Sequence, residues 1–204
     1  AGHAVGAETF RRITTYCKNL GMDYLTVYAF STENWKRSDE EVGAIMGLLE
    51  KYLHESVEKM EKDRIRLKIL GDTTALSPAI RGLIEKTDAI AARLPGCFQA
   101  NVCLNYGGRD EIVRAVNRFA AEHPGEAITE AAMADCLDTA GIPDPDLIIR
   151  TGGEYRISNF LMWESAYSEL YFTDVLWPDF SEKDIDEAVA EYRRRDRRFG
   201  GVKA

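Results

Sequence analysis

The sequence predicts an α/β fold in a single domain, residues 1–204, with a largely parallel central sheet flanked by helices on both faces. Short segments rich in β-branched and aromatic residues alternate along the chain with longer amphipathic segments, and strands separated by helices usually pair in parallel. The length of 204 residues fits one domain, and no internal repeat, low-complexity tract or linker divides it.

Local signals justify the elements of the first half. Gly21 ends the first helix, and a capping box of Ser38 and Glu41 begins a long second one. Ser77 and Pro78, an N-cap followed by a favoured first-turn proline, begin a third. We predict helices over 5–20, 39–63 and 78–92, strands over 24–30, 65–70 and 98–104, and a polar loop over 31–37. The apolar side of the long helix is expected to be core or the wall of a lipid groove.

The second half continues the alternation. Thr129 begins a helix that is expected to end at Gly141, and Pro143 and Pro145 bracket the turn that follows. The remaining predictions are helices over 110–122, 160–168 and 181–197, and strands over 147–150 and 170–172.

Composition and charge narrow the class of protein. With 45% hydrophobic and 29% charged residues, the chain is typical of globular proteins, and its net charge of −8 argues against nucleic acid as a partner. No apolar run reaches the roughly 18 residues that a membrane span needs, and no signal peptide is visible. The four cysteines lack CxxC spacing and are expected to be reduced. We therefore expect a cytoplasmic protein.

The segment from Arg150 to Phe160 is the most informative one for function. A short apolar strand places Arg150 at its carboxyl end, and two glycines then let the backbone turn tightly or approach a ligand. Arg156 and Ser158 follow before the predicted helix, so two guanidinium groups and a hydroxyl surround the turn. This set suits a phosphate or diphosphate. A glycine turn with two surface arginines explains the same residues equally well.

Polar segments follow three predicted strands, over 31–37, 105–109 and 150–158. Ligands of parallel α/β sheets bind outside the carboxyl ends of the strands, so we expect the three segments to converge on one edge. Neither GxGxxG nor GxxxxGK[ST] is present, and the two common nucleotide-binding loops therefore lack their defining residues.

Long motifs in these segments resemble the cis-prenyltransferase family, whose bacterial type is undecaprenyl diphosphate synthase. The resemblance covers essentially the whole chain. The matching segments are Ala29–Arg37 (AFSTENWKR), Leu104–Arg109 (LNYGGR), Arg150–Trp163, Ala166–Pro178 and Arg197–Gly201.

The resemblance implies an Mg²⁺-dependent transferase that adds isopentenyl diphosphate units to an allylic diphosphate such as farnesyl diphosphate. The product would be a long Z-polyprenyl diphosphate, undecaprenyl diphosphate for the cell-wall lipid carrier. It also implies a homodimer, in the cytoplasm or peripheral at a membrane surface with transient contact.

Roles are implied for residues that match the family motifs. Asn34 would be catalytic, in removal of the proton from the condensing unit, and Glu169 would be associated with the metal. Arg198 and Gly200 would belong to a tail that reaches across the dimer. Substrate-binding roles fall on His3, Ser31, Thr32, Glu33, Trp35, Arg37, Arg150, Arg156, Ile157, Ser158, Arg198 and Gly200.

One family segment precedes the first residue. Members begin with a strand leading to Asp-Gly-Asn-Gly-Arg-Trp, whose aspartate binds Mg²⁺, and the sequence starts after it. We therefore expect the N-terminal strand and the catalytic aspartate to be missing from the 204 residues.

Three other functions are considered. A non-catalytic partner subunit is disfavoured because a scaffold does not need Asn34, Arg37, Arg150, Arg156 and Glu169. A short-chain Z-farnesyl enzyme is disfavoured by the small Ala29, where bulk would shorten a product tunnel. A nucleotide-binding module lacks a fingerprint.

Overall fold

The computed structural model describes residues 2–196, and the side chains of residues 4–196. The chain divides into two compact units, one formed by residues 14–141 and the other by residues 1–13 together with 142–204. Each unit is described by itself.

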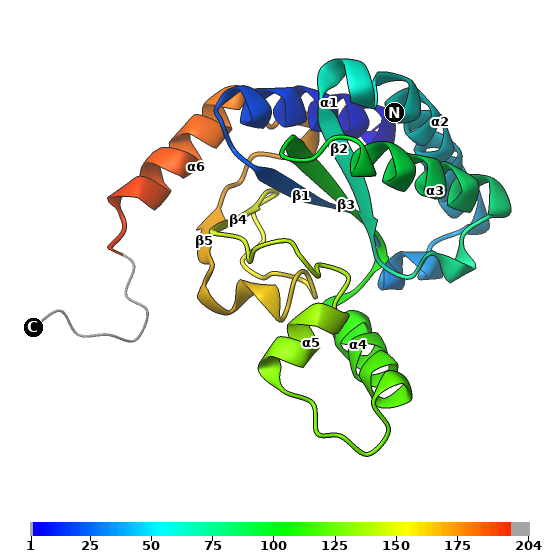
Figure 1. Cartoon of the computed structure of the whole chain (residues 1–204). Coiled ribbons are helices and arrows are strands. Elements are labelled where there is room, and N and C mark those ends of the chain that lie inside the picture. The colour runs from blue at the N-terminus through cyan, green and yellow to red at the C-terminus, as the bar shows by residue number, and fades with distance from the viewer. Residues whose placement is uncertain (1, 197–204) are drawn as a thin grey trace, which may run out of the picture. The chain divides into compact units, whose positions relative to one another are not determined.

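The unit of residues 14–141 contains a three-stranded parallel sheet (Figure 1). Its strands are β1 (Tyr24–Ser31), β2 (Ile65–Leu70) and β3 (Phe98–Tyr106), in the order β1-β3-β2. Its helices are α2 (Asp39–Asp63), α3 (Pro78–Ala92), α4 (Gly108–Glu122) and α5 (Glu130–Cys136). In the view of Figure 1, α2 and α3 lie together above the sheet and α4 and α5 lie below it. The α/β class and the parallel pairing are as predicted.

The core of this unit is centred on β3, because every residue of the middle strand is buried. The apolar side of α2 is covered less completely. Leu53 and Met60 are buried, whereas Leu48, Leu49 and Val57 remain partly exposed. This apolar face is therefore not wholly a packed core.

The other unit contains a two-stranded parallel sheet of β4 (Leu147–Arg150) and β5 (Glu169–Phe172), followed by α6 (Glu182–Arg194). The first part of α1 (Gly2–Asn19) belongs to it as well. The Thr9 hydroxyl donates to the Pro178 carbonyl at 3.0 Å, and Trp177 Nε1 donates to the Gly6 carbonyl at 2.9 Å. These bonds fasten the start of α1 to the segment before α6.

The capping signals in the sequence correctly predicted where α2 and α3 begin. The Ser38 hydroxyl accepts from the Glu41 amide, and the Ser77 hydroxyl accepts from the Ile80 amide with Pro78 at the first helical position. Gly21 has a φ of 80°, a conformation that suits the residue after a helix.

The helix predicted over 160–168 is wrong. Only a 3₁₀ turn over Glu164–Tyr167 forms, because Ser158, Asn159 and Leu161 have φ values of 50°, 64° and 45° and break any helix that starts near them. Smaller differences affect several other elements. The helix after Thr129 ends at Cys136, the last helix ends at Arg194, β3 extends to Tyr106, and the loop after β1 contains a 3₁₀ helix over Thr32–Lys36.

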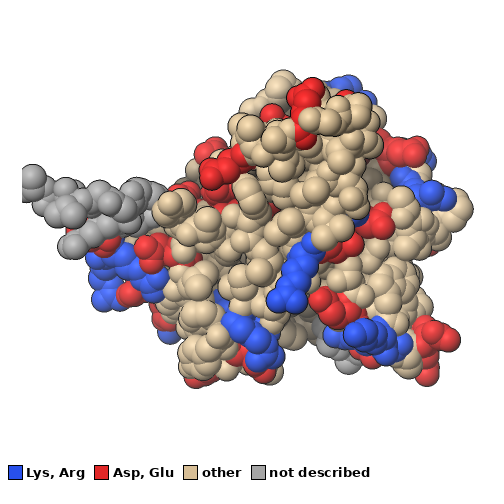
Figure 2. All heavy atoms as spheres, turned by 90° about the horizontal axis from the view of Figure 1, so that it is seen from below, with Lys and Arg blue, Asp and Glu red and all other residues tan. Residues whose placement is uncertain are grey.

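None of the helices among the described residues combines the length and apolar character of a bilayer-spanning segment. All four cysteines are free thiols, as expected, and burial raises the pKa of Cys17 to about 11. On the face drawn in Figure 2, Lys and Arg side chains are interspersed with Asp and Glu among a larger uncharged area.

Candidate functional site

The turn after β4 is held closely against the segment after β5. The Gly152 and Gly153 amides donate to the Val175 and Thr173 carbonyls at 2.9 and 3.0 Å. Both glycines have positive φ, 83° and 73°, and a Cβ atom on Gly153 would lie 3.1 Å from the Asp174 carboxylate. The positive φ values favour glycine at both positions, and at Gly153 the nearby Asp174 also leaves little room for a Cβ atom.

Arg150 is the last residue of β4 and stands at the start of this turn. Its Nε atom is buried and has no hydrogen-bond partner in the structure. A buried guanidinium N–H without an acceptor is costly, and such groups in native proteins usually mark a role that the protein alone does not fulfil. An anion at this position would supply the acceptor.

The residues after the turn are more exposed. Arg156 is exposed and its guanidinium pairs with the Glu154 carboxylate. Ser158 and Asn159 are partly exposed in left-handed conformations, which non-glycine residues seldom adopt and which are concentrated at binding sites. Ile157 accepts from the Phe160 amide through its carbonyl at 3.1 Å, which closes the turn.

Glu169 begins β5, and its carboxylate accepts from Arg195 Nη1 at 2.8 Å. Arg195 also donates to the Leu170 carbonyl at 2.9 Å and pairs with Glu191. Sequence reasoning missed Arg195, since nothing in the sequence signals a pair 26 residues apart. No cluster of three or more His, Cys, Asp or Glu side chains suited to a metal is found among the described residues.

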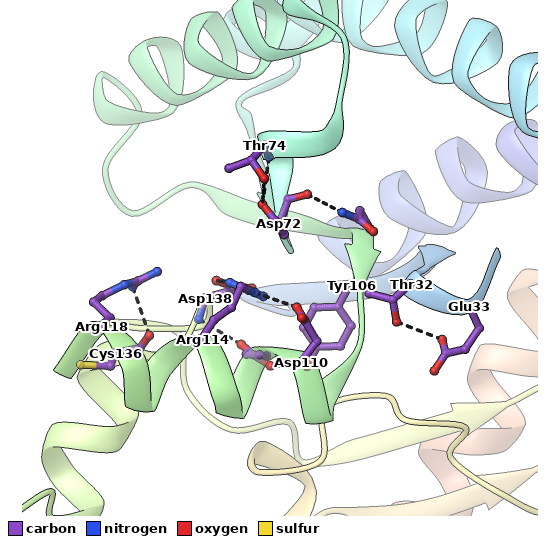
Figure 3. Close-up of polar contacts among 12 residues, drawn as sticks. Thr32, Glu33, Asp72, Thr74, Tyr106, Asp110, Arg114, Arg118, Cys136 and Asp138 are labelled. Atoms are coloured by element: carbon purple, nitrogen blue, oxygen red, sulfur yellow. Dashed lines mark hydrogen bonds and ion pairs between the residues drawn. The ribbon is translucent and has the colours of Figure 1, made fainter. Parts of the chain in front are cut away.

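Six predicted residues lie at the carboxyl end of β1 and in the segment that follows it. Asn34 Oδ1 accepts from the Ser31 amide at 2.9 Å, and this bond fixes the orientation of the Asn34 side chain. The Thr32 hydroxyl donates to Glu33 at 3.3 Å, as Figure 3 shows. Arg37 donates to Glu41 at 2.5 Å. The sixth residue, Trp35, packs edge-on against Phe30 with ring centroids 5.1 Å apart.

Asn105 joins this segment to the loop that follows β2. Its Oδ1 accepts from Trp35 Nε1 at 2.7 Å, and its Nδ2 donates to the Asp72 carbonyl at 2.7 Å. The Asp72 carboxylate in turn accepts from the Thr74 amide and hydroxyl (Figure 3). The hydrogen bonds from Thr74 hold the pKa of Asp72 below its ordinary value.

The base of α4 is built on a charged and hydrogen-bonded network (Figure 3). The Tyr106 hydroxyl donates to the buried Glu111 carboxylate. Arg114 donates to both oxygens of Asp138, at 2.8 and 2.6 Å, and to Asp110 at 2.7 Å. These bonds raise the pKa of Arg114, and the main cause is the pair of hydrogen bonds that its guanidinium donates to the Asp138 carboxylate. The network therefore holds in place the start of α4, which begins at Gly108, shortly after Asn105.

Two tyrosines connect β1 with the end of β3. The Tyr28 hydroxyl donates to the Tyr106 carbonyl at 2.9 Å, and burial raises the pKa of Tyr28. Tyr28 is therefore a neutral phenol at physiological pH.

The predicted residues thus fall into two groups. Ser31, Thr32, Glu33, Asn34, Trp35 and Arg37 lie together in the unit of residues 14–141, and Arg150, Arg156, Ile157, Ser158 and Glu169 lie together in the other. His3 lies in α1 but its side chain is outside the description, as are Arg198 and Gly200 entirely. Convergence of the polar segments on one edge stays a prediction.

Comparison with known proteins identifies relatives over nearly the whole chain. Residues 1–200 match the family model described as putative undecaprenyl diphosphate synthase. An isoprenyl transferase of Neisseria meningitidis is 46% identical over 199 residues, covering 98% of this chain and 79% of the relative. One from Chromobacterium violaceum is 48% identical over 200 residues, covering 98% of this chain and 79% of the relative.

Two solved structures are similar in fold. A probable undecaprenyl diphosphate synthase from Campylobacter jejuni superposes with a TM-score of 0.87 at 33% identity, covering 97% of this chain and 93% of that one. The lavandulyl diphosphate synthase of Lavandula x intermedia, in complex with dimethylallyl diphosphate, gives a TM-score of 0.90 at 34% identity, with coverage of 98% and 88%.

Proposed function

The chain belongs to the undecaprenyl diphosphate synthase family of isoprenyl transferases, and on this premise we propose that it condenses isopentenyl diphosphate with farnesyl diphosphate into a long Z-polyprenyl diphosphate, undecaprenyl diphosphate. The single observation that carries the proposal is the buried, unpartnered Nε of Arg150 beside the Gly152–Gly153 turn. A diphosphate is the anion that this family handles, and it would satisfy that donor.

The diphosphate of the isopentenyl unit would be bound by Arg150, Arg156 and Ser158, with the backbone of Ile157 shaping the turn. Arginine side chains bind phosphate oxygens through two parallel N–H groups, and the Ser158 hydroxyl adds a donor. Arg156 would exchange its pairing with Glu154 for the substrate. Arg198 and Gly200 are proposed to complete this site from the partner subunit.

Mg²⁺ fits the residues present to a limited extent. Glu169 offers one partly buried carboxylate, and Mg²⁺ is commonly held by one or two carboxylates together with substrate phosphates. The Arg195 pairing would position this carboxylate until the metal is bound. When bound, Mg²⁺ would neutralise the negative charge that develops on the departing diphosphate.

The allylic substrate would lie against the segment after β1, near Ser31, Thr32, Glu33, Trp35 and Arg37, with His3 near its diphosphate. The fold neighbour that carries dimethylallyl diphosphate supports an allylic diphosphate as ligand. As the carbon–oxygen bond to the diphosphate breaks, a carbon–carbon bond forms to the isopentenyl unit, which then loses a proton. Asn34 is held in one orientation by the Ser31 amide and would guide that transfer, but a neutral amide is a weak base. The released diphosphate is therefore the proposed proton acceptor.

A long product is supported by the incompletely covered apolar side of α2 and by the small Ala29 in β1. A homodimer is proposed because large apolar side chains recur between Phe160 and Phe172, where Met162, Tyr167 and Leu170 are exposed. The protein is proposed to act in the cytoplasm, with transient contact at a membrane surface when it releases product.

A condensation assay tests the proposal. Full-length protein is supplied with farnesyl diphosphate, labelled isopentenyl diphosphate and Mg²⁺, and the products are separated by chain length. Long Z-polyprenyl products are expected, and they should be strongly reduced by Asn34→Ala but not by Asn117→Ala, a matched change at an exposed asparagine of α4. In a parallel assay with geranyl diphosphate in place of farnesyl diphosphate, a product that stops at fifteen carbons would favour the short-chain alternative. Absence of product would favour a partner subunit.

A further inference from the structure

Asn105 is a buried residue in a conformation that few other residues adopt. Its side chain is 5% exposed and its φ is 46°, in the left-handed region where asparagine is tolerated better than most residues. It is the penultimate residue of β3 and makes two hydrogen bonds with the backbone of Asp72. Its own carbonyl accepts from the Asp72 amide at 3.2 Å, and its Nδ2 donates to the Asp72 carbonyl at 2.7 Å.

The backbone is tightly packed where the loop after β2 meets the end of β3. Gly71 has a φ of 124°, and a Cβ atom on it would lie only 2.0 Å from the Leu104 carbonyl oxygen. The β2 loop is therefore packed directly on the end of β3, and Asn105 is attached to a rigid base.

The remaining polar atom of the Asn105 side chain is directed to Trp35. Trp35 Nε1 donates to Asn105 Oδ1 at 2.7 Å, while the indole packs edge-on against Phe30. Yet Trp35 is 40% exposed. A tryptophan that served only to fill the core would be buried, whereas this bond fixes the plane of a ring that remains in contact with solvent.

We infer that Asn105 is a positioning residue for residues 31–37, the substrate segment. Its side-chain amide links Trp35 to the loop after β2 by hydrogen bonds, and so holds in place the 3₁₀ helix that carries Asn34. Trp35 and Asn34 are adjacent in that helix, so a displaced indole would move the Asn34 side chain with it. Misplacement of reacting groups by about 1 Å costs up to about a hundredfold in rate. The kinetic half of this inference depends on the proposed function, whereas the hydrogen bond itself does not.

Asn101 provides a matched comparison within the same strand. It is 0% exposed and also uses both ends of its amide, accepting from Gln99 Nε2 at 2.7 Å and donating to the Thr26 hydroxyl at 3.0 Å. Its partners lie within the sheet and away from the substrate segment. Loss of Asn101 should therefore affect stability without affecting the position of Trp35.

The test compares Asn105→Gly with Asn101→Ala in the full-length protein. Glycine removes the amide and keeps the left-handed backbone accessible. The indole N–H resonance of Trp35, assigned with Trp35→Phe, is measured by ¹H–¹⁵N NMR, and kcat and KM are measured by condensation assay. For Asn105→Gly, we expect this resonance to move upfield and kcat to fall about tenfold or more. For Asn101→Ala, we expect a lower Tm, an unchanged resonance and a near-normal kcat.

The double variant Trp35→Phe/Asn105→Gly distinguishes loss of the hydrogen bond between Trp35 and Asn105 from a general disturbance of the structure. If Asn105 acts through Trp35, adding Asn105→Gly to Trp35→Phe should cost no further kcat. Further loss in the double variant, an unmoved indole resonance, or a normal kcat in Asn105→Gly would each overturn the inference. A wild-type protein without activity would refute the proposed function and the kinetic role, while the resonance would still show whether the bond exists.

Discussion

Replacement of Arg150 by methionine should separate substrate binding from stability. Arg150→Met keeps much of the aliphatic volume but removes the guanidinium, including the buried Nε that has no partner. A buried, unsatisfied donor costs about 1–3 kcal/mol, so its removal should offset the lost interactions of the charged group. The free energy of unfolding should therefore stay within about 1 kcal/mol of wild type or rise.

The effect on substrate binding should be much larger. A hydrogen bond to a charged group contributes about 1.5–3 kcal/mol, and a forked contact to a diphosphate makes two such bonds. Loss of about 3 kcal/mol corresponds to a roughly hundredfold increase in the KM for isopentenyl diphosphate. The KM for the allylic substrate should change little, because its proposed site is the segment after β1.

Steady-state kinetics and thermal unfolding measure the two effects. Arg114→Met is the matched control, since Arg114 donates to Asp138 and Asp110 and has no proposed role in substrate binding. Its loss leaves the Asp138 carboxylate, 11% exposed, without its main partner and should cost about 2 kcal/mol, with a Tm lower by about 5 °C. An Arg150→Met protein with a lower Tm and an unchanged KM would refute the assignment of Arg150.

Three further predictions concern assembly and stability. Trp163→Arg should weaken dimerisation by placing a charge in the apolar segment, which sedimentation at low micromolar concentration would detect. Gly71→Ala should destabilise the protein by more than about 3 kcal/mol in urea unfolding, since its Cβ would overlap the Leu104 carbonyl oxygen at 2.0 Å. Thr74→Val should lower stability at pH 7, and the difference should diminish as the pH falls below the ordinary pKa of an aspartate carboxyl group. The Asp72 pKa is depressed by its bonds to Thr74, so this stabilisation is complete above the ordinary pKa and lost as pH falls through the depressed one.

Each of these three predictions would be contradicted by a specific result. A Trp163→Arg protein that sediments as a dimer would remove that segment from the interface. A Gly71→Ala protein no less stable than Gly141→Ala, where φ is 78° and the space around the Cβ position is open, would show that the junction can relax. A Thr74→Val deficit that does not diminish as the pH is lowered would mean that the hydroxyl contributes independently of the Asp72 charge.

The elements that sequence predicted best are those whose signals are local. Ser38 and Ser77 cap their helices as expected, because an N-cap hydroxyl reaches an amide only three residues away. The apolar run at Leu147–Arg150 likewise forms a strand within its predicted bounds. In both cases the residues that determine the structure are neighbours in the chain.

Features that local signals do not specify were not predictable in the same way. The segment after Ser158 has the composition of a helix, but the positive φ of Leu161 stops it before Glu164. Asn105 lies in the matching motif Leu104–Arg109, but the resemblance gave it no role, because its partner Trp35 is 70 residues away in the chain. Candidate site residues could be named from the sequence, whereas the hydrogen bonds that position them were found only in the structure.

The order β1-β3-β2 also has a consequence for how the chain is made. Both outer strands of this sheet pair with β3, which is the last of the three to be translated. The hydrogen bond between Thr26 and Asn101, for example, cannot form until 75 further residues have been made. In the part of the chain that the structure describes, β1 and β2 therefore leave the ribosome before the strand that joins them. Sheets assembled from such remote pairings form slowly and expose unpaired edges meanwhile. The nascent protein should thus depend on chaperones until β3 has emerged, and substitutions in β3 should reduce the yield of folded protein more than equally buried substitutions in α3.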